Sequence, residues 1–245
     1  MSCTTWTPLA VSSEGRPWSA RAWRVVEAQH IASTMKLVDN AAEQDLLESL
    51  LEGGKPPQPE AAAGLHYLLA TPFRYDPPPG GSRFRAATDP GVFYGAGGVR
   101  TACAELGYWR WKFLRDAVDL DKLEPVAHTA FQADIATTVV DLRNPPFDRD
   151  AACWNHPTDY GATQIFARTA REAQLGGIVY RSVRDPQPGW CVAVLTPRAF
   201  AKREPDPLTQ TWWIAVQPEA VVWRREHESF ILSATEWGLP TRSGR

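Results

Sequence analysis

Residues 72–106 place arginine and tyrosine side chains on turns just before an apolar helix. Arg74, Arg83 and Arg85 flank a run of prolines and glycines, and a guanidinium is a rigid fork of donors that matches phosphate oxygens. Tyr94 stands in GVFYGAGG, where the glycines would let a planar heterocycle stack on the ring. The plain alternatives are surface arginines and a tyrosine that anchors a strand end. As a group, these residues favour a pocket for a phosphate-bearing aromatic ligand.

Glu105 lies one turn inside the helix that Thr101 can cap. It stands one position too late for a capping box with Thr101, so capping does not explain it. A glutamate at the solvent edge of the helix is the plain alternative. A partly buried carboxylate beside arginines would instead stabilise positive charge that develops on a ligand. The helical spacing predicts a buried apolar stripe beside it, formed by Ala102, Leu106, Trp109 and Phe113.

Ser182 stands in YRSVRD, late in the chain. A serine hydrolase would need a G-x-S-x-G elbow and a histidine partner, and none of the five histidines lies in a recognisable motif. Ser182 is therefore predicted to donate a hydrogen bond to a ligand, with Arg181 and Arg184 as solvated strand ends. GAGGVRT lacks the G-x-G-x-x-G spacing and the βαβ setting of a dinucleotide fingerprint, which argues against a Rossmann fold.

The composition of the 245 residues fits one large domain, or one domain with an added segment. The formal net charge is −2 and no long basic run occurs, so direct nucleic-acid binding is not indicated. The sequence has neither a signal peptide nor a run of about 18 apolar residues, which predicts a cytoplasmic protein without a membrane span. The four cysteines form no C-x-x-C pair and have no histidine at metal-ligand spacing. They are predicted to be free thiols in a reducing cytoplasm, without a metal site.

The N-terminal part of the chain is predicted to be an extension before the main domain. Its clearest helix covers residues 39–52 and stops at two glycines. Part of residues 19–36 is also a possible helix. The loop KPPQPEAAAG sets a soft boundary between this partly helical extension (residues 1–58) and the main domain (residues 59–245). The apolar face of the 39–52 helix consists of Ala42, Leu46, Leu47 and Leu50.

The main domain mixes short strands with two helices. Helices are predicted over 101–118 and 159–176. Because there is no regular βαβ rhythm, the predicted fold class is α+β. Tryptophans in the last two strands are expected in the core; if exposed, they would mark an interface for a homo-oligomer. Strands are predicted at the end of 65–75 and over 82–87, 91–96, 125–142, 177–183, 191–200, 211–217 and 220–226.

The order of an arginine, a glutamate on the helix after GVFYGA, and a serine in YRSVR resembles the RES-domain family, named for its Arg, Glu and Ser. The blocks GSRFR, GVFYGAGGVRTACAE and GGIVYRSVRDPQPGWCVAVLTP are similar to the family's blocks, in the same order, over about residues 65–200. The N-terminal segment together with HYLLATPFRY resembles a longer branch of the family, which carries a helical extension before the RES core.

This resemblance implies an ADP-ribosyltransferase-like fold, with a mixed β core and flanking helices, that binds NAD+ as substrate. Family members are toxins of toxin–antitoxin pairs, and a helix-turn-helix (Xre-type) antitoxin blocks their pocket. They cleave the nicotinamide–ribose bond of NAD+ by phosphorolysis or hydrolysis, or transfer ADP-ribose to a protein. The function expected here is an NAD+ phosphorylase that uses inorganic phosphate and needs no prosthetic group. A hydrolase using Ser182 and a non-catalytic nucleotide-binding module are the rival classes.

The resemblance also implies roles for individual residues. Glu105 matches the family glutamate, which would stabilise the oxocarbenium-like state. Ser182 matches the family serine, which would hydrogen-bond the ribose or the amide of nicotinamide, and Tyr94 would stack on nicotinamide. The family arginine, which would hold the pyrophosphate or the attacking phosphate, corresponds equally well to Arg74 or Arg83. The role of Arg85 is open, because the family usually has a different residue at this point.

Overall fold

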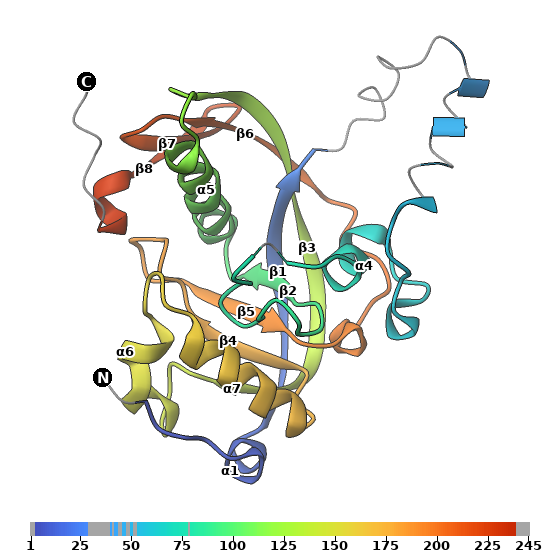
Figure 1. The fold of residues 1–245 in the computed structure, drawn as a ribbon, viewed down its shortest axis with the longest axis vertical. Coiled ribbons are helices and arrows are strands. Elements are labelled where there is room, and N and C mark those ends of the chain that lie inside the picture. Colours follow the sequence, from blue (N-terminus) through green and yellow to red (C-terminus); the bar gives the residue numbers. More distant parts are fainter. Residues whose placement is uncertain are drawn as a thin grey trace.

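The computed structural model describes residues 3–28, 40, 42–43, 46–47, 50, 53–77 and 79–238 (Figure 1). Its helices are α1 (Pro8–Ser13), α4 (Tyr67–Arg74), α5 (Val99–Asp116), α6 (Ala151–Trp154) and α7 (Gly161–Glu172). Its strands are β1 (Arg16–Glu27), β2 (Phe93–Ala96), β3 (Leu123–Asp141), β4 (Gly177–Arg181), β5 (Trp190–Val194), β6 (Gln210–Val216), β7 (Ala220–Arg225) and β8 (Glu228–Ser233). Short 3-10 helices are η1 (Glu60–Ala62), η2 (Phe147–Asp150), η3 (Pro197–Ala199) and η4 (Ala234–Trp237).

The strands form one mixed eight-stranded sheet in the order β1-β2-β5-β4-β3-β6-β7-β8. Only the short β3–β4 pairing is parallel, and the other pairings are antiparallel. A further pairing of β1 with β3 closes β1, β2, β5, β4 and β3 into a ring, while β6, β7 and β8 extend beyond it. With helices packed on this sheet, the predicted α+β class and the mixed β core with flanking helices are confirmed.

Two apolar cores lie on opposite faces of the ring, because successive side chains of a strand alternate between faces. On β4, Ile178 and Tyr180 belong to the core that also contains buried residues of α5 and α7. Val179, between them, belongs to the second core, which includes Leu69 and Phe73 of α4. α5 and α7 therefore cover one side of the strands, and α4 covers the other.

The face of α5 that the structure buries differs from the predicted stripe. Trp109 is 41% exposed and Phe113 is 56% exposed. The small residues of the helix face the sheet instead, and a Cβ on Gly107 would lie only 3.1 Å from Trp223 Nε1. Close approach of helix and sheet thus selects the face that carries these small residues over the neighbouring face with Trp109 and Phe113. The buried residues of α5 are Thr101, Ala102, Cys103, Ala104, Gly107, Tyr108, Trp111 and Leu114.

The N-terminal region contributes a strand where the sequence suggested a possible helix. Residues 16–27 form β1, which pairs with β3 residue by residue from Arg16↔Val139 to Glu27↔His128. Residues 29–36 of the possible helix lie outside the described residues. Within the helix predicted over 39–52, every described position from 42 to 50 is helical, whereas Asn40 lies in a bend, and the remaining positions lie outside the described residues. Although the first strand of the sheet precedes residue 58, the division of the chain at that residue stays a prediction.

Two short strand predictions were wrong. The segment 65–75 ends in the helix α4. Residues 82–87 form a turn in which Ser82 and Arg85 exchange backbone hydrogen bonds of 2.7 and 3.2 Å, next to Gly81 at φ +73°. A reversal this tight cannot continue as a strand, so Arg83 and Arg85 do not share a strand face. The predicted helices 101–118 and 159–176 are confirmed as α5 and α7, whereas β8 was not predicted. The cap expected at Thr101 was wrong, because α5 begins at Val99 with Gly98 at its N-cap.

The prediction of four free thiols was also wrong. Cys3 and Cys153 form a disulfide between positions 150 residues apart, while Cys103 and Cys191 are free and buried. The thiol argument for a reducing cytoplasm is thereby removed, and the location of the protein stays a prediction. None of the helices in the described part of the chain has the length and apolarity to cross a bilayer. Of the tryptophans in the last two predicted strands, Trp212 and Trp223 lie in the core as expected, whereas Trp213 is 50% exposed.

Candidate active site

A cavity of about 210 Å³ lies between α5 and the strands β1, β2, β4 and β5. Pockets for whole small molecules commonly enclose roughly 300–1,000 Å³. The cavity therefore fits one moiety of a dinucleotide, with the remainder of such a ligand outside it. Its charged and aromatic lining consists of Trp23, Arg24, Arg83, Tyr94, Glu105, Trp109, Tyr160, Tyr180 and Arg184, with Cys191 beside them.

Glu105 on α5 is held by Ser182, the residue that directly follows β4. Ser182 Oγ donates a hydrogen bond of 2.6 Å to Glu105 Oε1, and it accepts hydrogen bonds from the backbone amides of Arg184 and Asp185 at 3.2 and 3.1 Å. A hydroxyl can donate one hydrogen bond and accept two, so these three contacts occupy all its hydrogen-bonding positions. Ser182 is only 3% exposed. In this arrangement it orients Glu105; the direct contact with a ligand that the sequence suggested stays a prediction.

The turn after β4 is tied to the same helix that carries Glu105. Asp185 Oδ2 accepts a hydrogen bond of 2.8 Å from Thr101 Oγ1, and Asp185 Oδ1 lies 3.3 Å from Arg100 Nε. Asp185 also donates its amide to Ser182 Oγ. The contacts form a closed circuit from α5 through Asp185 and Ser182 back to α5, which fixes the distance between Ser182 and Glu105.

Arg83 projects from the 82–85 turn into the cavity wall and is 7% exposed. Its Nη1 donates to the carbonyl oxygens of Trp154 and His156, both at 2.9 Å. Its Cζ lies 4.8 Å from the centroid of the Tyr160 ring. Neutral carbonyls and a ring orient the guanidinium, and no carboxylate within the described ranges forms an ion pair with it. Its positive charge therefore remains available to an anionic ligand.

Arg184 is a second buried guanidinium in the cavity wall, although the sequence suggested a solvated strand end. It is 2% exposed, and its Cζ lies 3.3 Å from the centroid of the Tyr108 ring. Its Nη2 donates to the hydroxyl of Tyr160 at 3.0 Å and to the carbonyl of Pro157. The turn after β4 directs the side chain inward between α5 and the residues before α7, so that prediction was wrong.

Arg24 of β1 is the third arginine of the cavity. Nη1 donates to the carbonyl of Tyr94 at 2.8 Å, and Cζ lies 4.8 Å from the centroid of Phe93. Its Nε is buried and has no hydrogen-bond partner in the described part of the chain. Burial lowers the pKa of Arg24 from 12.5 to about 10. An anionic group of a ligand could accept a hydrogen bond from this Nε and balance the positive charge of the guanidinium.

Tyr94 of β2 lines the cavity, and its hydroxyl is engaged with the turn that carries Arg83. The hydroxyl lies 2.7 Å from Ser82 Oγ and accepts a hydrogen bond of 2.9 Å from the amide of Phe84. Burial raises the pKa of Tyr94 above its usual value. The residue therefore supports the position of Arg83, and its stacking on nicotinamide stays a prediction.

The residues that line the cavity include no nucleophile paired with a histidine. Cys191 Sγ lies 3.8 Å from Glu105 Oε1, and burial together with that negative charge raises the thiol pKa well above its usual range. Burial, with smaller contributions from Cys191 and Glu105, also raises the pKa of Tyr180. No histidine is among the residues that line the cavity. Ser182 lies against a carboxylate, with no imidazole there to accept its proton. Elsewhere in the described ranges, no group of three or more His, Cys, Asp or Glu is placed to hold a metal.

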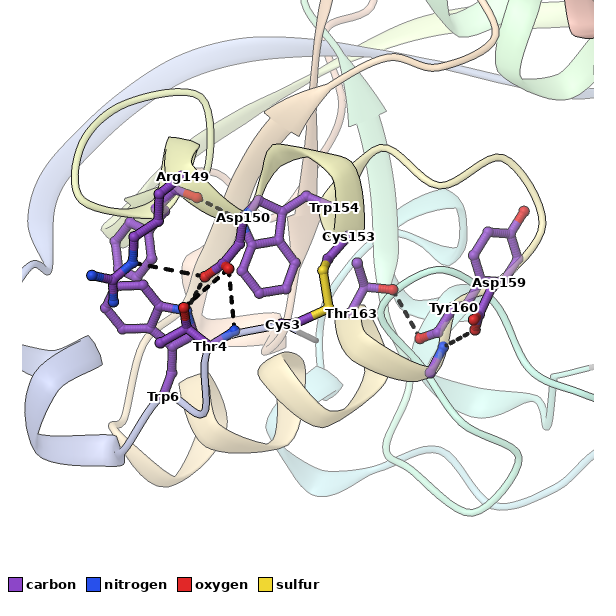
Figure 2. The surroundings of a disulfide bond; sticks show 12 residues. Cys3, Thr4, Trp6, Arg149, Asp150, Cys153, Trp154, Asp159, Tyr160 and Thr163 are labelled. Carbon is purple, nitrogen blue, oxygen red and sulfur yellow. Dashed lines mark hydrogen bonds and ion pairs between the residues drawn. A yellow bond between two sulfur atoms is a disulfide. The ribbon is translucent and has the colours of Figure 1, made fainter. Parts of the chain in front are cut away.

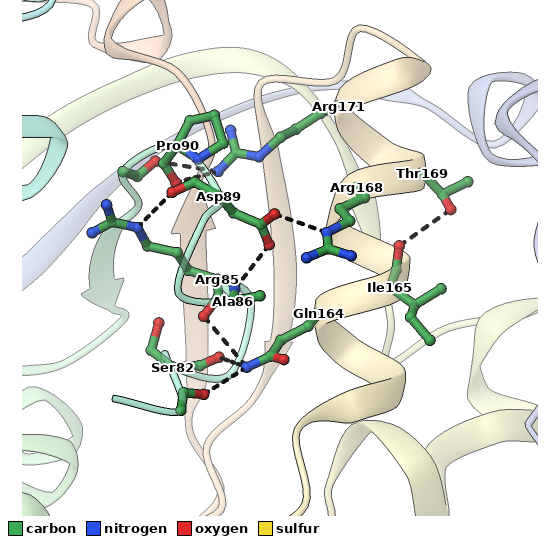
Figure 3. A network of polar contacts seen from close by, with 12 residues as sticks. Ser82, Arg85, Ala86, Asp89, Pro90, Gln164, Ile165, Arg168, Thr169 and Arg171 are labelled. Atoms are coloured by element: carbon green, nitrogen blue, oxygen red, sulfur yellow. Dashed lines mark hydrogen bonds and ion pairs between the residues drawn. The ribbon is translucent and has the colours of Figure 1, made fainter. Parts of the chain in front are cut away.

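Arg74 and Arg85 do not line the cavity. Arg85 donates to the carbonyls of Asp89 at 3.0 Å and Tyr75 at 2.8 Å, and burial lowers its pKa. Figure 3 shows this network, in which the carboxylate of Asp89 pairs with Arg168 at 2.8 Å. Arg74 lies on α4, where its Nε donates to the carbonyl of Pro56. Of the predicted site residues, the structure brings together Arg83, Tyr94, Glu105 and Ser182.

Sequence reasoning missed Arg24, Arg184 and Tyr160. A signal for Arg24 was present, since it interrupts the apolar run WRVV in the middle of a strand. The site that results has one oriented carboxylate, two buried guanidiniums, a third guanidinium whose Nε is buried, and several aromatic rings around a small cavity. Such a set can bind phosphate oxygens and an aromatic ring while holding negative charge against a centre that becomes positive.

Comparisons with known proteins place the chain in a family. No curated protein matches it. A chain of the crystal structure of the M. tuberculosis MbcT–MbcA toxin–antitoxin complex matches with 12% identity and a TM-score of 0.47, covering 94% of each chain. The family model of the RES domain matches residues 58–217, more than half of the sequence. The chain therefore belongs to the RES domain family, as its sequence blocks suggested.

Proposed function

We propose that this protein is a toxin of a toxin–antitoxin pair that cleaves the nicotinamide–ribose bond of NAD+, with inorganic phosphate as acceptor. The products would be nicotinamide and ADP-ribose-1″-phosphate. One observation carries the proposal. Ser182 orients the carboxylate of Glu105 in a cavity whose other charged side chains are arginines.

Glu105 suits the chemistry at the ribose. Loss of nicotinamide leaves an oxocarbenium-like ribose, and a fixed carboxylate beside it stabilises that positive charge. Nicotinamide is cationic in NAD+ and leaves as a neutral molecule, so the step needs no strong general acid. A cavity lined by no histidine and by a thiol with a raised pKa is compatible with this reaction.

The arginines suit the phosphates. Arg83 and Arg184 are oriented by carbonyls and rings, and Arg24 has a free Nε donor. With about 210 Å³ inside, the cavity would hold the nicotinamide riboside end, while the arginines bind pyrophosphate oxygens or the attacking phosphate. The role proposed from sequence for Arg74 or Arg83 would thus fall to Arg83 together with Arg24.

A partner that covers this cavity is part of the proposal. The RES family resemblance implies an Xre-type antitoxin, and Trp109 at the cavity and Phe113 one turn further along α5 are exposed aromatic residues. Large exposed apolar groups beside a cavity are common at interfaces. Binding of an antitoxin there would exclude NAD+.

The first experiment is NAD+ consumption by the purified protein with and without inorganic phosphate, with products identified by mass. Phosphate-dependent loss that yields ADP-ribose-1″-phosphate supports the proposal. Loss that gives ADP-ribose without phosphate would show hydrolysis instead. If NAD+ binds but is not cleaved in either condition, the non-catalytic module would replace the phosphorylase. Transfer of labelled ADP-ribose to a protein would establish the transferase alternative.

A further inference from the structure

The N-terminal residues 3–6 are fastened to residues 147–154, far away in the sequence (Figure 2). The Cys3–Cys153 disulfide joins them covalently. Next to it, Asp150 Oδ1 accepts hydrogen bonds from the amide and the hydroxyl of Thr4 at 3.1 and 3.0 Å, and Asp150 Oδ2 accepts one from Trp6 Nε1 at 3.1 Å. We call this set of contacts the N-terminal clasp.

Aromatic packing completes the clasp. The Trp6 ring lies 4.5 Å from the Phe147 ring, and Arg149 Cζ lies 4.6 Å from the Trp6 centroid. Phe147 and Trp154 each contact Phe166 of α7, at 5.5 and 5.1 Å between centroids. The clasp thus holds the 147–154 segment against α7 and the core beneath it.

The same segment and the turn after it orient two arginines of the cavity. The carbonyls of Trp154 and His156 accept the hydrogen bonds of Arg83, and the carbonyl of Pro157 accepts one from Arg184. Cys153 immediately precedes Trp154, so the disulfide ends one residue before the first of these carbonyls. Short contacts therefore lead from Cys3 to the guanidiniums.

We propose that Cys3–Cys153 is a thiol-reactive control site: its reduction releases the N-terminal residues and loosens residues 153–160, which hold Arg83 and Arg184 in place. The inference concerns the regulation of the proposed active site. It rests on the proposed function only for its effect on NAD+ turnover, because the loosening itself is independent of any substrate.

The chemistry requires a thiol as co-reactant, such as glutathione or a dithiol. A thiolate attacks one sulfur of the disulfide, the S–S bond breaks, and a mixed disulfide forms while the other cysteine leaves as thiolate and takes up a proton. A second thiol then displaces the remaining cysteine, so two thiols become one disulfide as two cysteine thiols form. Cys3 and Cys153 are half-buried, whereas the two free cysteines are fully buried, so the reagent has access to this pair alone.

Hydrogen exchange read by mass spectrometry tests the proposal without any ligand. The amides of Asn155 and Asp159 are hydrogen-bonded, to Ala151 O and His156 Nδ1, and should be protected in the oxidised protein. We expect at least roughly tenfold faster exchange over 153–160 after reduction, because a tether has been removed from a locally stable unit. Amides of β4 and β5 serve as the internal control and should not change.

Cys3→Ser separates the disulfide from other effects of the reductant. This variant should exchange as fast over 153–160 as the reduced wild type, with or without reductant. Cys103→Ala, which keeps the disulfide, should still respond to reductant. Equal exchange over 153–160 in the oxidised and reduced wild type would overturn the proposal, and so would four alkylatable thiols in the unfolded, never-reduced protein. Neither result depends on NAD+ cleavage, so this inference and the proposed function can fail separately.

Discussion

Ser182 Oγ donates a hydrogen bond of 2.6 Å to Glu105 Oε1 and thereby connects two residues 77 positions apart. The bond joins the helix α5 to the turn after β4, and Asp185 closes the circuit through Thr101. A carboxylate that is bound on one oxygen keeps its orientation without losing its charge. The pair is therefore an oriented negative charge, which is what a reaction with a cationic transition state requires.

Glu105→Gln should lower NAD+ turnover by roughly 100- to 1,000-fold, by analogy with the loss of one preorganised electrostatic group. The amide is almost isosteric, so the fold should be retained. Turnover measured by nicotinamide release checks this, with circular dichroism and thermal unfolding as controls. Wild-type activity in a correctly folded Glu105→Gln protein would remove Glu105 from the mechanism.

Ser182→Ala should lower the turnover of NAD+, because Glu105 remains in the cavity but loses the hydrogen bond that orients its carboxylate. A hydrogen bond to a charged group contributes about 1.5–3 kcal/mol, which corresponds to roughly 10- to 100-fold in rate. The effect should appear in kcat more than in KM, because the substrate does not contact the lost hydroxyl in this arrangement. A pure rise in KM would instead show that Ser182 binds the ligand directly, as the sequence first suggested.

Arg24→Met should abolish saturation by phosphate or weaken NAD+ binding while leaving stability unchanged or higher. The wild-type side chain is a desolvated cation with an unpaired donor, and apolar replacement of such a group is often neutral or stabilising. Arg21→Met on the same strand is the matched control, since its side chain is 55% exposed and pairs with Asp134. If the two variants bind phosphate and NAD+ equally well, Arg24 has no role in ligand binding.

Asp150 should make the stability of the N-terminal clasp depend on pH. Burial opposes ionisation, but hydrogen bonds from Thr4 and Trp6 outweigh it, and the pKa of Asp150 is lowered below its usual value. A depressed carboxylate pKa stabilises the fold above the unfolded value of about 3.9, and that contribution is lost as pH falls through the folded pKa.

Urea unfolding of wild type and Asp150→Asn tests this expectation. The difference in unfolding free energy should be largest near neutral pH and shrink below about pH 4, where the carboxyl protonates in the unfolded chain before it does in the folded one. Asp148→Asn, at an exposed position of η2, should show a small difference that does not change with pH. A difference for Asp150→Asn that grows on acidification would contradict the assignment.

The sequence alone determined what depends on local pattern. Helical spacing located α5 and α7, and β-rich apolar runs located β2 to β7, whereas the cap expected at Thr101 lies inside α5. The blocks around Arg83, Tyr94, Glu105 and Ser182 identified the RES family, and the structure brings these four residues to one place. Local patterns suffice for these features because helices, strands and family blocks are each encoded in short contiguous segments.

Which arginines line the cavity depends on contacts between segments that are far apart in the sequence. Arg74, Arg83 and Arg85 look alike in sequence, yet the turn at Gly81 sends Arg83 to the carbonyl of Trp154 and Arg85 to that of Tyr75. Arg24 and Arg184 reach the cavity through strand pairing and a turn that no local pattern specifies. The Cys3–Cys153 bond could not be predicted from local sequence either, because contact between residues 150 positions apart depends on the path of the whole chain.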